Sequence, residues 1–252
     1  MRVRLATYNV KGFPWTKPPI QSIVHWITSR SGTDIVALQE VWCRHTAWAT
    51  AFAAAGWSFI RPPREHHIAG MFGSGLAIAW RRSEWKLTDA RFYPYLSAVG
   101  FDAFVTKGWF RAEFTRCAAT GGHLRLINTH MQSDYEVWDD LWRPIAEPVR
   151  MAQAFQLTET EARMPPAPTL IVGDLNTEAC WFTECRYLTA HAGMTFPGTG
   201  QVLDHCAAPR GQPWVLGAHR VCREAGEWSD HWPVVWDLRY QRFSPSPSRA
   251  SA

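Results

Sequence analysis

Residues 169–176 read TLIVGDLN, and this stretch decides the fold. Residues 169–172 predict a short buried strand, because the apolar run lies between a Pro-rich linker and a Gly-Asp pair. Asp174 and Asn176 follow directly, where the strand meets its loop. Layered α/β folds build their functional sites at such strand ends. The stretch therefore predicts a central strand with functional polar residues at its end.

The rest of the chain repeats this arrangement, with apolar strands that alternate loosely with helices. We expect strands over residues 3–10, 34–38, 76–80, 91–95, 108–115, 123–129, 202–207 and 232–238. We expect helices over 20–31, 46–55 and 183–192, and a helical region over 138–161 that Pro144 and Pro148 interrupt. This order predicts an α/β fold in one domain over 1–240. The Ser/Pro-rich residues 241–252 predict a disordered tail.

The composition limits the class of protein. The chain has 252 residues, of which 46% are hydrophobic, so it can build a full core. A net charge of +4 tolerates an anionic partner without requiring one. Six Cys residues in 252 are too few for a disulfide scaffold, and they form no CxxC pair, which argues against a structural zinc site. No apolar run is long enough to cross a bilayer and no secretory leader is visible, so we expect a cytoplasmic or peripheral membrane location.

Polar residues stand at the ends of most of the expected strands. Each of them, taken alone, is ordinarily a turn residue or a satisfied polar group. Their shared position at strand ends indicates that they form one site. The residues are Asn9, Glu40, His130, Asp174, Asn176, Asp204, Asp230 and His231.

These residue types suit metal-assisted hydrolysis of a phosphate ester. The carboxylate of Glu40, with Asn9 or Asp230, offers hard oxygen ligands for Mg²⁺ or Mn²⁺. A His beside an Asp can act as a base that activates water. A second His can donate to a phosphoryl oxygen as its negative charge grows. The sequence therefore predicts a divalent metal and an attacking water.

Six ordered motifs resemble the endonuclease/exonuclease/phosphatase (DNase I-like) superfamily. The motifs are TYNV, LQE, NTH, GDLN, LDH and SDHWPV, and they extend from Asn9 to Val234. The resemblance implies a four-layered α/β sandwich with two packed mixed sheets flanked by helices. It also implies the site. Glu40 would bind the metal, with Asn9 and Asp230 near it.

The same resemblance implies the roles of the other residues. His231 would be the general base or would polarise the phosphate, and Asp204 would orient it. Asp174 would position or activate the attacking water. Asn176 and His130 would contact the scissile phosphate.

Three segments are similar to the neutral sphingomyelinase-like branch of that superfamily: GSGLAIAW at 73–80, FDAFVTKG at 101–108 and INTHMQSD at 127–134. The second implies that Asp102 and Lys107 form a substrate-binding pair beside the site. The branch implies hydrolysis of sphingomyelin to ceramide and phosphocholine at a membrane surface. Candidate membrane contacts are the apolar residues that flank polar loops, namely Phe13, Trp15, Met71 and Phe72.

Other functions use the same residues. A nuclease acting on DNA or RNA is the main alternative, although clustered Lys and Arg would be expected there, and Lys is scarce. A phosphoinositide or phosphomonoester phosphatase is a further alternative, and a non-catalytic binding module is another. A basic groove across the site would favour the nuclease. Apolar side chains that project outward beside the site would favour the lipid.

Overall fold

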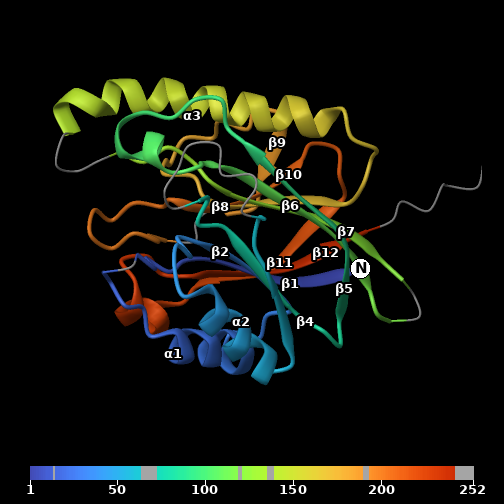
Figure 1. Ribbon diagram of the computed structural model, residues 1–252. Coiled ribbons are helices and arrows are strands. Elements are labelled where there is room, and N and C mark those ends of the chain that lie inside the picture. Colours follow the sequence, from blue (N-terminus) through green and yellow to red (C-terminus); the bar gives the residue numbers. More distant parts are fainter. Residues whose placement is uncertain (14, 64–72, 119–120, 135–138, 190–192, 242–252) are drawn as a thin grey trace, which may run out of the picture.

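The computed structural model describes residues 1–13, 15–63, 73–118, 121–134, 139–189 and 193–241. Two six-stranded sheets pack face to face at its centre (Figure 1). Helices cover the outer face of each sheet, so the order of layers is helix, sheet, sheet and helix. This arrangement confirms the expected four-layered α/β sandwich with two mixed sheets. Met71, Phe72 and residues 242–252 lie outside the described part of the chain.

The first sheet and its helices consist of β1 (Arg2–Asn9), β2 (Ile35–Gln39), β3 (Trp57–Ile60), β4 (Ala77–Arg81), β11 (Trp214–Val221), β12 (Val234–Tyr240), α1 (Ile20–His25) and α2 (His45–Ala54). The strand order is β11-β12-β1-β2-β4-β3. Only the central pair, β1 and β2, is parallel among these neighbours. The helix α1 continues directly into a π-helical turn over Trp26–Arg30.

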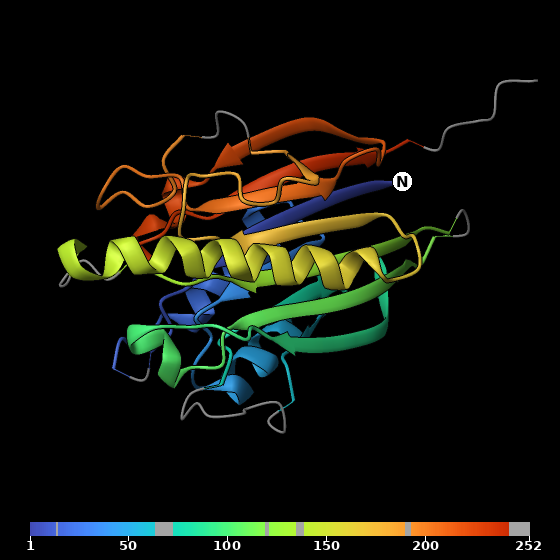
Figure 2. The same cartoon turned by 90° about the horizontal axis from the view of Figure 1, so that it is seen from above.

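The second sheet and its helix consist of β5 (Trp85–Pro94), β6 (Gly108–Arg116), β7 (His123–His130), β8 (Thr169–Asp174), β9 (Cys185–Tyr187), β10 (Asp204–Pro209) and α3 (Asp139–Ala162). The strand order is β5-β6-β7-β8-β10-β9, and β7 and β8 form its parallel pair. Seen from above, the long helix α3 lies across this sheet (Figure 2). Short 3-10 helices occupy Gly100–Phe104 and Arg223–Trp228.

Apolar residues fill all three spaces between the layers. Alternate residues of a strand point to opposite faces, so Leu5 of β1 packs between the sheets while Tyr8 packs against the helices. The helix α3 packs on the second sheet through residues such as Leu157, which contacts the cluster around Ile171. Because the central strands are buried on both faces, they read as continuous apolar runs in the sequence.

A buried polar network joins the two sheets beneath the strand ends. The Gln39 Nε2 donates to Asn128 Oδ1 at 2.7 Å, so β2 of one sheet contacts β7 of the other. The Asn128 Nδ2 in turn donates to the carbonyl oxygens of Leu38 and Ala77, each at 2.9 Å. A satisfied buried network of this kind fixes the relative position of the layers that it joins.

The structure corrects two of the expected helices. The helix expected over 183–192 is wrong, because Cys185–Tyr187 form the edge strand β9, which pairs with β10. Pairing at a sheet edge overrides the local helix preference there. The interruption expected at Pro144 and Pro148 is also wrong, because α3 runs continuously through both positions. Pro148 lies on the exposed side of α3, so the helix keeps its packing on the sheet.

The structure also contains two strands that the sequence pattern did not predict. They are β3 and β11, the two edges of the first sheet. The six Cys residues are all free thiols. Among the described residues, no helix has both the length and the apolar character needed to span a membrane.

Candidate active site

The predicted site residues converge where the parallel pairs of the two sheets end. Asn9 ends β1, His130 ends β7 and Asp174 ends β8, and His130 pairs with Asp174 in the sheet register. A pocket of about 370 Å³ opens there. The predicted residues that line it are Glu40, Asp102, Lys107, His130, Asp174, Asn176, Asp230 and His231. Asn9 and Asp204 are buried and contact these lining residues from behind.

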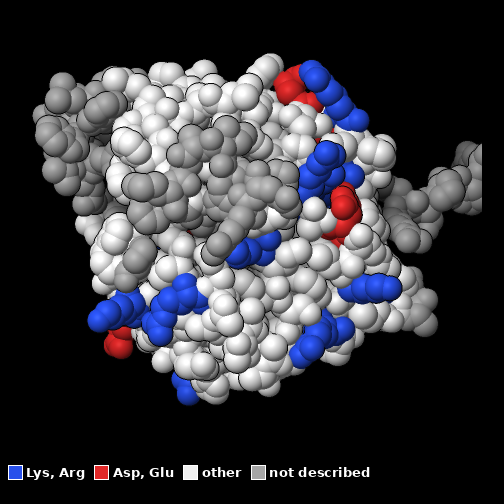
Figure 3. Space-filling model, viewed as in Figure 1, with Lys and Arg blue, Asp and Glu red and all other residues white. Residues whose placement is uncertain are grey.

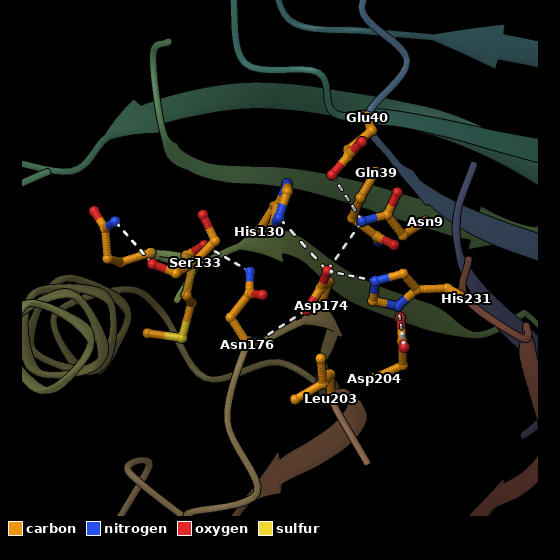
Figure 4. A network of polar contacts seen from close by, with 12 residues as sticks. Asn9, Gln39, Glu40, His130, Ser133, Asp174, Asn176, Leu203, Asp204 and His231 are labelled. Carbon is orange, nitrogen blue, oxygen red and sulfur yellow. Dashed lines mark hydrogen bonds and ion pairs between the residues drawn. The ribbon is translucent and has the colours of Figure 1, made fainter. Parts of the chain in front are cut away.

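Asp174 lies at the centre of the site (Figure 4). Its Oδ2 accepts a hydrogen bond from Asn9 Nδ2 at 3.0 Å and lies 3.5 Å from the Nε2 of His130 and 3.6 Å from the Nε2 of His231. Its Oδ1 accepts the backbone N–H of Asn176 at 2.9 Å. Burial raises the pKa of Asp174, although the nearby His231 partly offsets this. A carboxylate with a raised pKa is suited to accepting a proton.

His231 and Asp204 form a hydrogen-bonded pair that spans the two sheets. His231 precedes β12 of the first sheet, whereas Asp204 begins β10 of the second. The His231 Nδ1 lies 2.8 Å from Asp204 Oδ2. Burial alone would lower the pKa of His231, but the carboxylates of Asp204 and Asp174 outweigh it and raise this pKa to about 10. His231 is therefore an imidazolium at neutral pH.

His130 differs from His231 in its protonation. Burial first, and then the positive charges of Lys107 and His231, hold the pKa of His130 well below its usual value of 6.5. His130 is therefore neutral at pH 7. The pocket thus carries one charged and one neutral imidazole, and opposite environments of this kind separate the chemical roles of like residues.

Glu40 enters the pocket from the end of β2. Its backbone is left-handed, with φ 58°, so the chain turns sharply as the strand ends. The Oε1 accepts a hydrogen bond from Asn9 Nδ2 at 3.1 Å. Burial raises the pKa of Glu40 to about 7, with the Asn9 contact opposing the rise. Because Asn9 Oδ1 accepts the backbone N–H of Lys11 at 3.1 Å, the amide of Asn9 bridges Glu40 and Asp174 through its nitrogen.

The donor set fits one hard divalent cation completed by water and substrate. Glu40 is a pocket-lining carboxylate whose ionised form burial disfavours, and a bound cation would restore that form. Asp230 lines the same pocket and pairs with Lys11 Nζ at 2.7 Å. Within the described ranges, no three His, Cys, Asp or Glu side chains form a ready metal cage.

Asp102 and Lys107 reach the pocket as a buried ion pair. The Lys107 Nζ lies 3.3 Å from Asp102 Oδ1 and donates to the Met131 carbonyl oxygen at 2.9 Å. The Oδ2 of Asp102 accepts from the backbone N–H and the Oγ of Ser133 at 2.8 and 2.9 Å. Only 3% of Lys107 and 4% of Asp102 are exposed. The resemblance of FDAFVTKG to the sphingomyelinase-like branch implied a pair beside the site, and the structure places both residues at the pocket.

Asn176 also reaches the pocket, with a left-handed backbone at φ 52°. Its Nδ2 donates to the carbonyl oxygen of Met131 at 3.1 Å. The same carbonyl accepts from Lys107, so Asn176 and Lys107 are fixed by one shared acceptor. Both side chains therefore face the same wall of the pocket.

Several pocket residues carried no signal in the sequence. The ring of Phe196 lies 4.9 Å from the imidazole of His231, measured between centroids. Trp42 lines the pocket as well. These residues come from loops, which have no period that sequence analysis can detect. Only position relative to a recognised motif could have indicated Trp42, which follows Glu40 by two residues.

Two pairs of aromatic residues flank the mouth of the pocket, and three of the four are exposed while Phe13 is half-buried. Phe13 stacks on Trp15 at 4.9 Å, and 64% of Trp15 is exposed. Phe101 lies 6.3 Å from Phe104, and 43% and 59% of these side chains are exposed. Phe13 and Phe101 also line the pocket itself. We call these four residues the aromatic rim.

Comparison with solved structures places the chain in a known fold. A beta toxin variant from Staphylococcus aureus, solved with bound magnesium ions, is 16% identical, with a TM-score of 0.71 over 96% of this chain and 100% of that chain. TDP2 from D. rerio, solved with a single-strand DNA product, is 13% identical, with a TM-score of 0.71 over 94% and 99%. Sphingomyelinase C from Streptomyces griseocarneus is 16% identical, with a TM-score of 0.65 over 94% and 99%.

These likenesses establish the DNase I-like fold. No curated protein sequence matches the chain significantly. The model of the Endonuclease/Exonuclease/phosphatase family matches residues 6–237, which include every residue of the site described above. The chain therefore belongs to the Endonuclease/Exonuclease/phosphatase family and is a phosphoric ester hydrolase.

Proposed function

We propose that the protein is a Mg²⁺-dependent phosphodiesterase that hydrolyses a phospholipid, sphingomyelin, at a membrane surface. The observation that carries the hydrolysis is the convergence of Asp174, the His231–Asp204 pair and Glu40 on one pocket. We infer that residues 1–240 act as one catalytic domain, located at the periphery of a membrane or in the cytoplasm. Mn²⁺ is the alternative cation.

In this proposal each residue of the pocket has a separate role in one displacement at phosphorus. Asp174, with its raised pKa, takes the proton of the attacking water, whose oxygen forms a bond to phosphorus opposite the lipid alkoxide. The bond from phosphorus to that alkoxide breaks, and the leaving oxygen takes a proton from solvent water. The imidazolium of His231 donates to a non-bridging oxygen as charge grows there, and Asp204 keeps it oriented. His130, Asn176 and Lys107 hold the remaining oxygens. Glu40, with Asp230 beside it, would hold a Mg²⁺ ion, which would neutralise part of the phosphoryl charge.

Two features support a lipid substrate over a nucleic acid. The aromatic rim borders the pocket mouth, and exposed aromatic rings there can enter a headgroup layer. Five carboxylates line the pocket, whereas Lys107 is its one Lys or Arg among the described residues. On the face shown in Figure 3, the Lys and Arg side chains stand in scattered groups and do not merge into a basic stripe. Phosphates that flank a cleavage site in DNA require such a stripe.

The main alternative is a nuclease that uses the same catalytic residues. The TDP2 structure with its DNA product favours it, because that protein shares the fold. Exposed aromatic rings can also stack on unpaired bases. A phosphoinositide phosphatase is the second alternative, consistent with the family description. Parallel hydrolysis assays with sphingomyelin and with plasmid DNA separate the lipid from the nucleic acid.

The affinity for Mg²⁺ is expected to rise with pH. The pKa of Glu40 is about 7, so protons compete with the cation below that pH and no longer compete above it. The apparent dissociation constant for Mg²⁺ should therefore fall about tenfold between pH 6 and pH 8. Titration calorimetry with MgCl₂ measures this directly. A wild-type affinity that is constant between pH 6 and pH 8 would contradict the assignment of Glu40.

Glu40→Gln is the matched variant for this titration. The amide keeps the shape of the side chain but has no proton to lose, so the affinity should be lower and independent of pH. Raising the Mg²⁺ concentration should partly restore hydrolysis. If added Mg²⁺ restores nothing, Glu40 is not a metal ligand.

Removing the aromatic rim is expected to weaken vesicle binding. The double variant Trp15→Ser/Phe104→Ser deletes two exposed rings, and its partitioning onto sphingomyelin vesicles should fall about tenfold or more. Hydrolysis of soluble bis(4-nitrophenyl) phosphate should remain unchanged, because neither residue lines the pocket.

Phe155→Ser is the control for this change. Phe155 lies on α3 with 67% of its surface exposed and does not line the pocket. It should leave vesicle partitioning unchanged. Equal losses from both changes would mean that any exposed ring contributes, and the rim would have no special role.

A further inference from the structure

A buried threonine outside the recognised motifs is hydrogen-bonded to Asp204 and to the residue that follows His231. The Oγ1 of Thr195 accepts the backbone N–H groups of Leu203 at 2.9 Å and of Asp204 at 3.1 Å. Its carbonyl oxygen accepts the backbone N–H of Trp232 at 2.7 Å. Trp232 directly follows His231, so one residue is bonded to Asp204 itself and to the neighbour of His231. Thr195 has no exposed surface.

These bonds bear on the His231–Asp204 contact because His231 and Asp204 come from two separate sheets. Asp204 begins β10 of the second sheet, and Trp232 leads into β12 of the first. The 2.8 Å contact between His231 and Asp204 therefore depends on how the two sheets sit relative to each other at this end. A displacement of about 1 Å at a catalytic group can cost roughly 100-fold in rate. A residue that bonds to both sheets at this point limits that displacement.

We propose that Thr195 is a positioning residue that holds Asp204 and His231 in contact across the two sheets. The inference rests on the proposed function in one respect, namely that His231 acts on the phosphoryl group. Thr195 itself does not line the pocket, so it acts only through the pair. Thr195→Val keeps the shape of the side chain and removes the acceptor for two backbone N–H groups. Thr195→Ser keeps that acceptor and removes only a methyl group.

A second buried threonine that bonds to β10 offers a matched control. Thr189 is also buried, and its Oγ1 accepts the backbone N–H of Cys206 at 2.8 Å and donates to the Cys206 carbonyl at 3.3 Å. Cys206 lies on β10 two residues beyond Asp204. Thr189→Val therefore removes a comparable buried side-chain acceptor for the backbone of β10, but it leaves the bonds of Asp204 and Trp232 in place.

The test compares hydrolysis of bis(4-nitrophenyl) phosphate at saturating Mg²⁺ by five proteins: wild type, Thr195→Val, Thr195→Ser, Thr189→Val and His231→Ala. Thr195→Val should lower kcat about 10- to 100-fold with KM little changed. Thr195→Ser and Thr189→Val should keep kcat within about threefold of wild type, since both leave the pair positioned. The two Val variants should melt at similar temperatures, so that stability does not explain the difference.

A second readout needs no substrate. The Nδ1–H proton of His231 should give a downfield NMR signal, identified by its absence in His231→Ala. That signal should persist in Thr195→Ser and Thr189→Val and disappear or shift in Thr195→Val. If Thr195→Val does not fold, Thr195→Cys replaces it, because a thiol is a weaker acceptor of similar size.

The outcomes separate this inference from the proposed function. Equal kcat values and equal His231 signals in Thr195→Val and Thr189→Val would overturn the positioning role. An unchanged kcat in His231→Ala would instead overturn the catalytic role of His231, and with it the proposed mechanism. In that case the NMR comparison would still decide whether Thr195 holds the pair together.

Discussion

Replacing His231 with Ala is expected to lower kcat roughly 10²- to 10⁴-fold while KM changes little. The imidazolium is buried beside Asp174 and bonded to Asp204, so it is already oriented before substrate enters. A fixed donor of this kind interacts most strongly with the charge that develops in the transition state. The measurement is steady-state hydrolysis at saturating Mg²⁺. An effect confined to KM would contradict a catalytic role for His231.

The pH profile of the wild type distinguishes the two roles considered for His231. Its pKa is raised to about 10, so the imidazolium is present below that pH and is lost above it. If His231 polarises the phosphate as a cation, kcat/KM falls as the pH rises through about 10. If His231 were the general base, kcat/KM would rise through the same range. His219→Ala is the control and should keep the wild-type pH profile. His219 lies on the edge strand β11 and does not line the pocket.

Replacing Gly173 with Ala is expected to disrupt the floor of the site. Gly173 has φ 144°, and a Cβ on it would lie 1.8 Å from the carbonyl oxygen of Thr129. The two residues pair in the parallel β7–β8 ladder, one position before His130 and Asp174. The strands would have to separate where these catalytic side chains are fixed. We expect a loss of about 3 kcal/mol or more in the free energy of unfolding, together with loss of activity.

Thermal unfolding measures this loss, as a decrease of roughly 6–12 °C in Tm for a chain of this size. Gly211→Ala is the matched control. Gly211 has φ 81°, but nothing lies within 4 Å of the position of its Cβ. It should therefore show only the smaller cost of a left-handed backbone. Similar Tm decreases in both variants would show that backbone strain, and not the close approach of β7 to β8, explains the need for Gly173.

The sequence predicted the central strands far better than the edges of the sheets. Strands such as β1, β2 and β8 are buried on both faces, so their apolar runs are unmistakable. The two strands that were missed, β3 and β11, are edges of the first sheet. The expected helix that proved to be β9 is an edge of the second. Edge strands face solvent on part of their surface, as the mixed burial of β11 shows. Their sequences therefore lack the continuous apolar run that identifies a central strand.

The site was predictable to the extent that its residues end central strands. Glu40, His130, Asp174 and His231 lie beside recognisable apolar runs, and the structure brings all four to one pocket. Thr195 comes from a connection that local sequence cannot place, because its partners Asp204 and Trp232 lie at the starts of strands in different sheets. The sequence likewise did not indicate that Asn9 bridges Glu40 and Asp174. That position depends on the orientation of its side-chain amide, whose nitrogen donates to both carboxylates.

The most direct test of the account is a pair of parallel hydrolysis assays, each with Mg²⁺ and with EDTA. One assay offers sphingomyelin in mixed micelles and measures phosphocholine release. The other offers plasmid DNA and measures nicking. The account predicts Mg²⁺-dependent release of phosphocholine while the plasmid stays intact. Nicked plasmid with untouched sphingomyelin would contradict the lipid assignment, and release that persists in EDTA would contradict the metal site at Glu40.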